Sequence, residues 1–252
     1  MTSRKKIWLT LSLVVLIVAI SGAYGIWRIL SNAPSVVTLE DAVATLTQTE
    51  ESGDNKTIPS ADRAESESAS GEWVIDNTSG NFTFEDASGS FVGFRIDEKL
   101  VGIGSVTAVG RTDVVSGKIV IDGSSLVETV IEADLSTIVT NDSRRDRAAR
   151  NALKVKENPV ASFILQDAIK FDIAGIEGQA IQAEALGQLT INAISQPATF
   201  IIDAQLVNNQ IVLVGSAEVE FSDFGVEVPS APIVVSAEDF GIIEFQLLLT
   251  RN

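Results

Sequence analysis

The chain of 252 residues contains no histidine and no cysteine. Without histidine there is no Ser-His-Asp triad, no imidazole acid–base step and no imidazole metal ligand. Without cysteine there is no disulfide, no thiol nucleophile and no zinc site of the Cys or Cys/His type. Only carboxylate, Lys, Tyr or Ser/Thr chemistry and oxygen-ligand metals remain, and the sequence offers no convergent carboxylate motif. We therefore expect a protein that is not an enzyme, with no catalytic residue, no metal and no cofactor.

Positive charge is also scarce. Lys and Arg number 18 against 34 Asp and Glu, which gives a net charge of -16 and a sequence pI near 4.3. A surface this acidic repels phosphate backbones, so we expect no nucleic acid partner. The plain interpretation is that the charge keeps an exported protein soluble.

A long apolar run lies at the N-terminus. No residue from Ile7 to Trp27 is charged, and about 20 such residues span the core of a bilayer. The basic residues 4–6 favour a cytoplasmic N-terminus with the remainder of the chain outside. We therefore expect a cytoplasmic segment at residues 1–6 and a transmembrane anchor at 7–30, which makes a single-pass protein of the cell membrane. The alternative is a cleaved signal peptide, with Ser21 and Ala23 preceding the cleavage site.

Residues 31–70 are dominated by Ser, Thr, Ala, Glu and Asp. Such a composition cannot bury enough apolar surface to offset the entropy of ordering, so we expect a flexible acidic stalk. One stretch departs from this pattern, because Thr38 followed by Asp41 resembles a capping box and Leu39, Val43 and Leu46 share one side of a helix. A short, isolated helix is marginal in water, so we expect this one to be transient or membrane-proximal.

Alternation with a period of two dominates residues 71–252. In the densest stretch Val127, Thr129, Ile131, Ala133 and Leu135 fall on one face of a strand. Glycines punctuate the segments as hairpin turns and barrel bends do. The pattern predicts an all-β domain, either a closed antiparallel barrel or a sandwich. The inward stripe, which is either solid core or the lining of a tunnel, comprises Val92, Phe94, Ile96, Ile131, Leu135, Phe163, Leu165, Leu189, Ile191, Phe200, Ile202, Phe245 and Leu247.

A charged patch at residues 141–159 breaks the alternation and predicts a short helical insert. Arginines there are suited to bind a polar or anionic head group at the mouth of the barrel. The structural alternative is a helix capped by Asn141 or Ser143, in which Asp146 and Arg150 form a pair one turn apart. The candidate rim residues are Arg144, Arg145 and Asp146.

Two other acidic motifs have plain interpretations. Asp223-Phe224-Gly225 has the letters of a kinase triplet, but the other kinase motifs are missing, so we expect a turn whose Phe224 enters the core. Acidic pairs such as Glu132 and Asp134 lie on one strand face and are interpreted as solvated charge on the outer wall rather than as a calcium site.

The short motifs of this domain, taken in order, resemble those of a YceI-like domain. They are Trp73-Val74-Ile75-Asp76, Ser90-Phe91-Val92-Gly93-Phe94, Ser116-Gly117-Lys118-Ile119, Ser136-Thr137-Ile138, Thr140-Asn141, Arg145-Asp146, Asn158-Pro159, Ala161-Ser162-Phe163, Gly187-Gln188-Leu189-Thr190-Ile191, Gln196-Pro197 and Asp223-Phe224-Gly225. The resemblance covers roughly residues 71–252. The sequence departs after Arg-Asp, where many members carry histidine and a Phe-containing turn and this chain has Arg147-Ala148-Ala149-Arg150.

This resemblance implies a lipocalin-like, eight-stranded barrel whose apolar interior holds a long isoprenoid-type chain, either a polyisoprenoid or a quinone. Physical reasoning alone says that such a barrel either is filled by side chains or holds one small ligand. We therefore expect an extracytoplasmic, membrane-tethered protein that holds or carries a hydrophobic lipid within the inward stripe. The alternative is a filled barrel that serves as a structural or protein-interaction module at the cell surface. A homodimer is left open.

Overall fold

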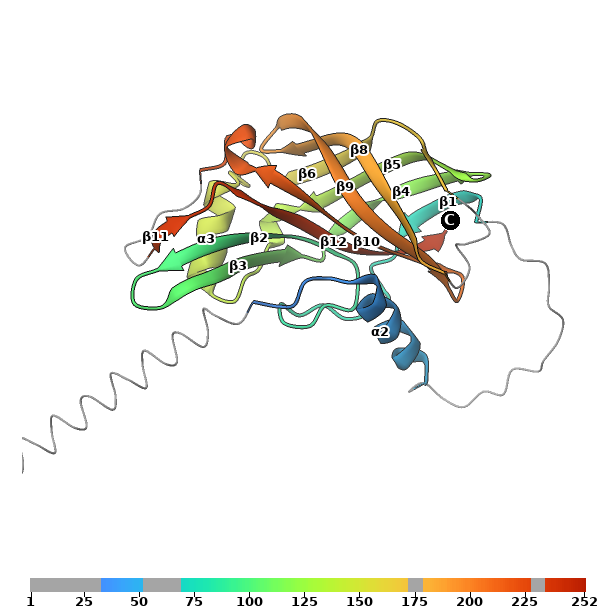
Figure 1. The fold of residues 1–252 in the computed structure, drawn as a ribbon, viewed down its shortest axis with the longest axis horizontal. Coiled ribbons are helices and arrows are strands. Elements are labelled where there is room, and N and C mark those ends of the chain that lie inside the picture. The colour runs from blue at the N-terminus through green and yellow to red at the C-terminus, as the bar shows by residue number, and fades with distance from the viewer. Residues whose placement is uncertain (1–32, 52–68, 172–178, 228–233) are drawn as a thin grey trace, which may run out of the picture.

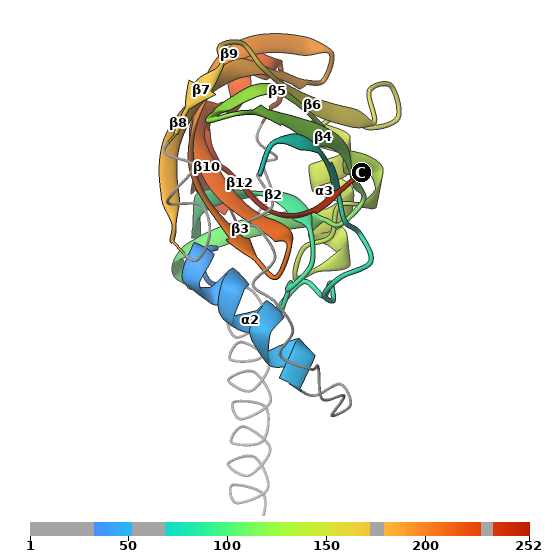
Figure 2. The ribbon, with the colours of Figure 1, turned by 90° about the vertical axis from the view of Figure 1, so that its right-hand side faces the viewer.

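Eight antiparallel strands of the described residues close into a barrel (Figures 1 and 2). The structure is a computed structural model that describes residues 33–51, 69–171, 179–227 and 234–252. Around the barrel the strands are β1 (Gly71–Ile75), β4 (Val115–Asp122), β5 (Ser125–Asp134), β6 (Val160–Leu165), β8 (Ile181–Ile191), β9 (Ile194–Val207), β10 (Gln210–Glu220) and β12 (Phe240–Arg251). The barrel closes through β1, which pairs with β4 on one side and with the C-terminal part of β12 on the other. The predicted all-β barrel is thus confirmed, and the sandwich alternative was wrong.

Further strands extend the barrel sheet to 12 strands. The first part of β12 pairs with β2 (Phe91–Leu100), which pairs in turn with β3 (Gly104–Thr112) and β11 (Val234–Ala237). The short β7 (Ile169–Lys170) pairs with β5. The β2–β3 hairpin therefore leaves the closed ring beside β1 and gives β12 a second neighbour along the same edge (Figure 1).

Strands β4, β8 and the first half of β9 alternate buried and less buried residues as the period of two predicts, whereas β5 contains a bulge and β10 and β12 are buried at consecutive positions. In β4, Ile119 and Ile121 are buried while Asp122 is exposed. In β5 the register shifts at a bulge, so that Leu126 is buried and Val127 is 44% exposed. The prediction that Val127 faces inward was wrong, because a bulge adds one residue and reverses the alternation before it.

Two tight turns fix the register of the longest strands. Asn192-Ala193 joins β8 to β9 and Asn208-Asn209 joins β9 to β10, and all four residues have positive φ. Two-residue hairpins of the type I′ form require positive φ at both positions, a conformation that Asn tolerates well. These turns aim the inward residues of three consecutive strands at the same interior.

The predicted helical insert is α3 (Ser143–Ala152), which follows the 3-10 turn η1 (Leu135–Thr137). Its cap is Asp142, whose side chain accepts a hydrogen bond from the backbone nitrogen of Arg144, and not Asn141 or Ser143. The expected pair between Asp146 and Arg150 is also absent from the described contacts. The Asp146 carboxylate instead accepts hydrogen bonds from Thr140, while Arg150 donates to the carbonyl oxygen of Ile138.

A second helix, α2 (Leu39–Glu51), packs on the outer wall of the barrel (Figure 2). The capping box is confirmed, because the Thr38 hydroxyl donates to Asp41 at 2.7 Å and accepts from the backbone nitrogen of Asp41 at 3.2 Å. Ala42 is buried against the outward side chains of Val212, Val214 and Leu248. The expectation of a transient helix was therefore wrong, because tertiary contacts supply the stability that a short helix lacks by itself, while its place near a membrane stays a prediction.

The predicted anchor at residues 7–30 lies outside the described residues. Within the parts of the chain that the structure describes, no helix is both long and apolar enough to cross a membrane. The anchor, the orientation in the membrane and the homodimer all stay predictions.

Candidate ligand-binding site

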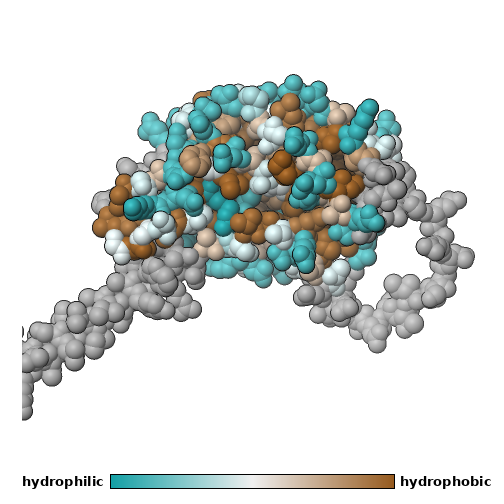
Figure 3. All heavy atoms as spheres, viewed as in Figure 1, coloured by the Kyte–Doolittle hydropathy of each residue, from teal (hydrophilic) through white to brown (hydrophobic). Residues whose placement is uncertain are grey.

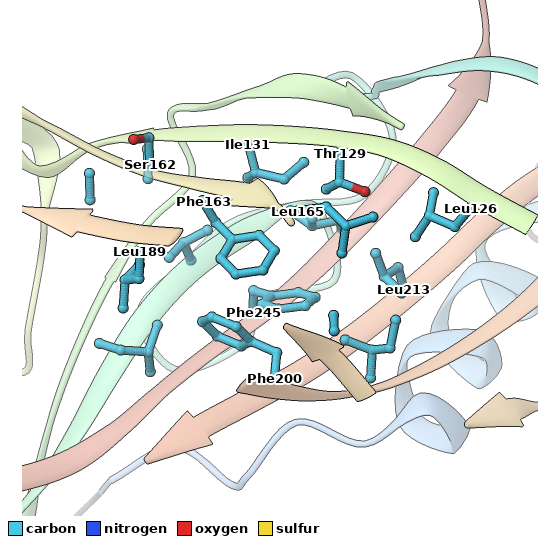
Figure 4. Close-up of a pocket in the computed structure, with 17 residues that line it drawn as sticks. Leu126, Thr129, Ile131, Ser162, Phe163, Leu165, Leu189, Phe200, Leu213 and Phe245 are labelled. Atoms are coloured by element: carbon cyan, nitrogen blue, oxygen red, sulfur yellow. The ribbon is translucent and has the colours of Figure 1, made fainter. Parts of the chain in front are cut away.

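An apolar cavity of about 70 Å³ lies inside the barrel (Figure 4). Six of the barrel strands and β2 contribute to its lining, so it occupies the interior rather than a groove on the outside. None of the described residues that line it is charged, and only Thr129 and Ser162 among them carry polar side chains. The lining residues are Val92, Leu126, Thr129, Ile131, Ala133, Ala161, Ser162, Phe163, Leu165, Ala185, Leu189, Phe200, Ile202, Leu213, Ile243, Phe245 and Leu247.

The predicted inward stripe supplies about half of this lining. The stripe residues that face the cavity are Val92, Ile131, Phe163, Leu165, Leu189, Phe200, Ile202, Phe245 and Leu247. Sequence reasoning did not place Leu126 there because of the bulge at Val127, and it passed over small residues such as Ala161 and Ala185. The alternation itself marks those alanines, since Ala161 lies two residues before Phe163 and Ala185 lies four residues before Leu189, which puts both on the inward face.

The other four stripe residues lie in the solid part of the core. Phe94 and Ile96 belong to β2 and pack near the 3-10 turn η3 (Phe221–Phe224), where the rings of Phe94 and Phe221 meet edge to face at 6.4 Å. Leu135 and Ile191 are buried in the same core cluster as the apolar residues of α3 and its C-terminal turn. The prediction for Phe224 is confirmed, because its side chain is buried and Gly225 adopts a left-handed conformation after it.

Three phenylalanine rings occupy the middle of the cavity region (Figure 4). The ring of Phe200 lies 5.0 Å from that of Phe163, edge to face, and 5.6 Å from that of Phe245. Such contacts stabilise a core beyond the burial of area alone. The cavity is therefore what these rings leave unfilled.

Glycines on neighbouring strands make room for two of these rings. A Cβ atom at Gly187 would lie 2.4 Å from the ring of Phe163, and one at Gly215 would lie 2.5 Å from the ring of Phe245. Each ring therefore covers the backbone of the adjacent strand, an arrangement known to protect glycines in sheets. The two glycines are visible in the sequence, but a glycine in a strand indicates a bend of the barrel equally well.

The candidate rim residues Arg144 and Arg145 both form ion pairs with nearby carboxylates. Arg145 pairs with Glu98 of β2 at 2.9 Å and binds the side chain of Asn141. Arg144 pairs with Asp142, and its side chain is 83% exposed. Hydrogen bonds from the Arg144 side chain and backbone lower the pKa of Asp142 to about 2. None of the three rim residues lines the cavity, so their role toward a head group stays a prediction.

A buried ionic cluster lies on the outer wall, which sequence reasoning did not foresee. Glu244 of β12 is 2% exposed and pairs with Arg111 of β3 at 2.8 Å and with Arg95 of β2 at 3.3 Å. The intervening Gly93 allows this, because a Cβ there would lie 2.8 Å from the Cγ of Arg111. The two arginines also donate to the carbonyl oxygens of Pro34 and Ser35, so the cluster fastens the segment that leads into α2.

The remaining chemistry of the described residues is modest. They contain no group of three or more Asp and Glu side chains that could hold a metal ion. The pattern that does stand out is an uncharged interior inside a wall whose ionic groups face outward.

A closed antiparallel barrel with an apolar cavity defines the class of the protein, that of small barrels able to hold one hydrophobic ligand. The YceI-like domain model matches residues 73–247, and the chain belongs to that family. Similar solved structures show the same fold. A polyisoprenoid binding domain from Saccharophagus degradans, implicated in plant cell wall breakdown, is 17% identical with a TM-score of 0.55, covering 71% of this chain and 98% of that one. BcnA from Burkholderia cenocepacia is 15% identical with a TM-score of 0.51, covering 69% of this chain and 98% of its own. No curated protein matches the chain.

Proposed function

We propose that this chain is a membrane-tethered binding protein whose barrel holds an uncharged, hydrophobic chain of the isoprenoid type outside the cytoplasm. The observation that carries the proposal is the apolar cavity inside the closed barrel. Apolar surface gains about 25 cal/mol per Å² when it leaves water, and the described lining offers no charge that would oppose a hydrocarbon. Family membership, together with the polyisoprenoid binding of the Saccharophagus degradans domain, supports the isoprenoid class.

The cavity is too small to hold a long isoprenoid chain unless side chains move. Pockets for drug-sized ligands run from about 300 to 1,000 Å³, whereas this cavity measures about 70 Å³. A chain of several isoprene units therefore requires the rings of Phe163, Phe200 and Phe245 to turn aside. We propose that these three side chains move apart when a ligand binds. The ligand then makes contacts with the rings in place of the contacts that the rings make with one another.

The membrane part of the proposal depends on the sequence. The uncharged run from Ile7 to Trp27 is long enough to span a bilayer, and basic residues precede it. A carrier held at the membrane stays next to the bilayer that supplies its ligand. No catalytic step is proposed.

Filling the cavity tests this function. Ala185 of β8 faces the cavity and is 4% exposed, so Ala185→Leu places an isobutyl group where the ligand would lie. The full chain is purified from cells, extracted with organic solvent, and the extract is analysed by mass spectrometry. We expect the unmodified chain to retain an isoprenoid lipid and Ala185→Leu to retain about 10-fold less, because overpacking a cavity excludes other occupants.

The matched control is Glu184→Leu, which adds the same side chain to the exposed face of the same strand. It should retain as much lipid as the unmodified chain. Equal retention by Ala185→Leu and the control would contradict the proposal, provided that both variants unfold cooperatively.

The cluster of three phenyl rings favours a second function, that of a filled barrel acting as a structural or protein-interaction module. In that case the cavity is a packing defect and the outer wall carries the function. Figure 3 shows polar and apolar side chains interspersed over one face of that wall. An unmodified chain that yields no isoprenoid after purification, and takes up none when incubated with polyprenyl lipids and quinones, would decide for this alternative.

A further inference from the structure

One residue that lines the cavity carries a buried hydroxyl with no hydrogen-bond partner among the described residues. Thr129 of β5 is 7% exposed, and its Oγ1 atom contacts neither a donor nor an acceptor within the described chain. The residue belongs to the cavity lining and lies beside Ile131 and Leu165 (Figure 4). Burying a hydroxyl without a partner destabilises a folded chain, so its presence among apolar neighbours calls for a cause.

The surroundings of Thr129 do not offer that partner. The other polar lining residue is Ser162 of β6, whose hydroxyl points away from the three phenyl rings in Figure 4. An ordered water is a poor substitute, because a buried water needs about two to four polar partners and an apolar cavity stays dry. An oxygen atom that belongs to the ligand needs only one partner, since its own carbon chain fills the apolar space.

We infer that the Thr129 hydroxyl is a specificity-determining group that hydrogen-bonds an uncharged oxygen of the ligand, either a hydroxyl or a carbonyl. The inference rests on the proposed function and deepens it. It places the polar end of the ligand inside the barrel, beside β5. It also excludes an ionised group at this position, because the described lining carries no charge that would compensate one. The preferred ligand is therefore an isoprenoid alcohol or quinone rather than a pure hydrocarbon or a prenyl phosphate.

The test uses a pair of ligands that differ by one hydroxyl. Binding of radiolabelled farnesol to the full chain is measured at equilibrium and is competed with unlabelled farnesol or with farnesene, which has the same carbon skeleton without the oxygen. Thr129→Val keeps the shape of the side chain and removes its hydroxyl. We expect this variant to bind farnesol about 3- to 10-fold more weakly, the usual range for one neutral hydrogen bond, with no comparable loss for farnesene.

Two further variants separate hydrogen bonding from structural damage. Thr129→Ser should restore the preference for farnesol, because it restores the hydroxyl. Thr199→Val, the same substitution on the exposed face of β9, should change binding of neither ligand. Without ligand, Thr129→Val should unfold about 2–4 °C higher than the unmodified chain, since an unpaired hydroxyl has been removed.

The outcomes distinguish this inference from the proposed function. If Thr129→Val weakens both ligands equally, or neither, the hydroxyl does not select the ligand and the inference is overturned while lipid binding stands. If the unmodified chain binds neither farnesol nor farnesene, the proposed function and the inference fail together. A loss confined to farnesol supports both.

Discussion

Successive residues of β12 face two different buried regions, which are the inside of the barrel and a covered part of its outer wall. Phe245 and Leu247 point into the barrel, where the packing leaves a cavity and an unpaired hydroxyl. Glu244, Gln246 and Leu248 point outward, yet they are only 2%, 3% and 0% exposed. The outward residues are covered by the β2–β3 hairpin, by the chain between β1 and β2, and by the segment that leads into α2.

The two interiors differ in how completely their polar groups are satisfied. Outside, Glu244 binds two guanidinium groups, and the Gln246 side chain donates to the carbonyl oxygen of Gly89 at 3.0 Å. Inside, the Thr129 hydroxyl has no hydrogen-bond partner among the described residues, and the apolar packing leaves a cavity. A fully paired network rigidifies a wall, whereas vacant space and an unpaired hydroxyl favour an occupant. We therefore expect the covered outer wall to stabilise the fold and the inside of the barrel to bind the ligand.

The largest expected effect comes from breaking the outer cluster. Glu244→Ala leaves Arg95 and Arg111 buried without their carboxylate and should lower the free energy of unfolding by about 3–5 kcal/mol. Chemical denaturation of the full chain measures the loss. Glu218→Ala removes a carboxylate from an exposed position of β10 and should change stability little. Similar stability losses for the two variants would mean that the cover over β12 is unimportant; Glu244→Gln serves if Glu244→Ala does not fold.

A smaller effect is expected from Asp76, a buried carboxylate that forms no ion pair with any of the described residues. Burial raises the pKa of Asp76, but hydrogen bonds from Ser79 and Thr78 outweigh it and lower the pKa to about 2. Above its usual pKa of 3.8 the full stabilisation is present, and it is lost as the pH falls from about 4 towards 2, because the unfolded chain binds the proton first. The contribution is about 2 kcal/mol.

Stability measured against pH checks this expectation. In Asp76→Asn the loss between about pH 4 and pH 2 should be smaller than in the unmodified chain by that amount. Asp113→Asn, at an exposed position between β3 and β4, is the control. An unchanged profile for Asp76→Asn would show that the hydrogen bonds from Thr78 and Ser79 do not hold the charged form.

The smallest effect is expected where the outer wall is uncovered. Lys118 of β4 pairs with Glu72 of β1 at 2.8 Å, but both side chains are more than a third exposed. Solvent screens such a pair, so Lys118→Met should leave the unfolding midpoint unchanged within error at moderate salt. A loss comparable to that of Glu244→Ala would show that charge pairing itself, rather than the cover over it, stabilises the wall.

The interior of the barrel was predictable from sequence to a large degree because the period of two is a local property. Phe163 and Leu165, or Phe200 and Ile202, need only the strand conformation to be placed on one face. Leu126 could not be placed in this way, because a bulge changes the count and has no strong sequence signature. Thr129 was placed on the inward face, but its missing partner depends on side chains from several strands.

The covered outer wall was not predicted, although its sequence carries a signal. The runs Ile211-Val212-Leu213-Val214 and Leu247-Leu248-Leu249 are apolar at consecutive positions, which indicates strands buried on both faces. Something must therefore cover β10 and β12 from outside. The helix α2 does so with Ala42 and its apolar side, and the capping box at Thr38 had already marked where that helix begins.

The fastening of residues Pro34 and Ser35 has a mechanical consequence. Three guanidinium–carbonyl hydrogen bonds from Arg95 and Arg111 hold these two residues side by side on the barrel wall. A force applied to the chain on the N-terminal side of Pro34 acts on these three hydrogen bonds together, before it reaches any strand of the barrel. Because three hydrogen bonds rather than one hold this segment, residues 34 and 35 cannot pivot on the barrel wall about a single contact.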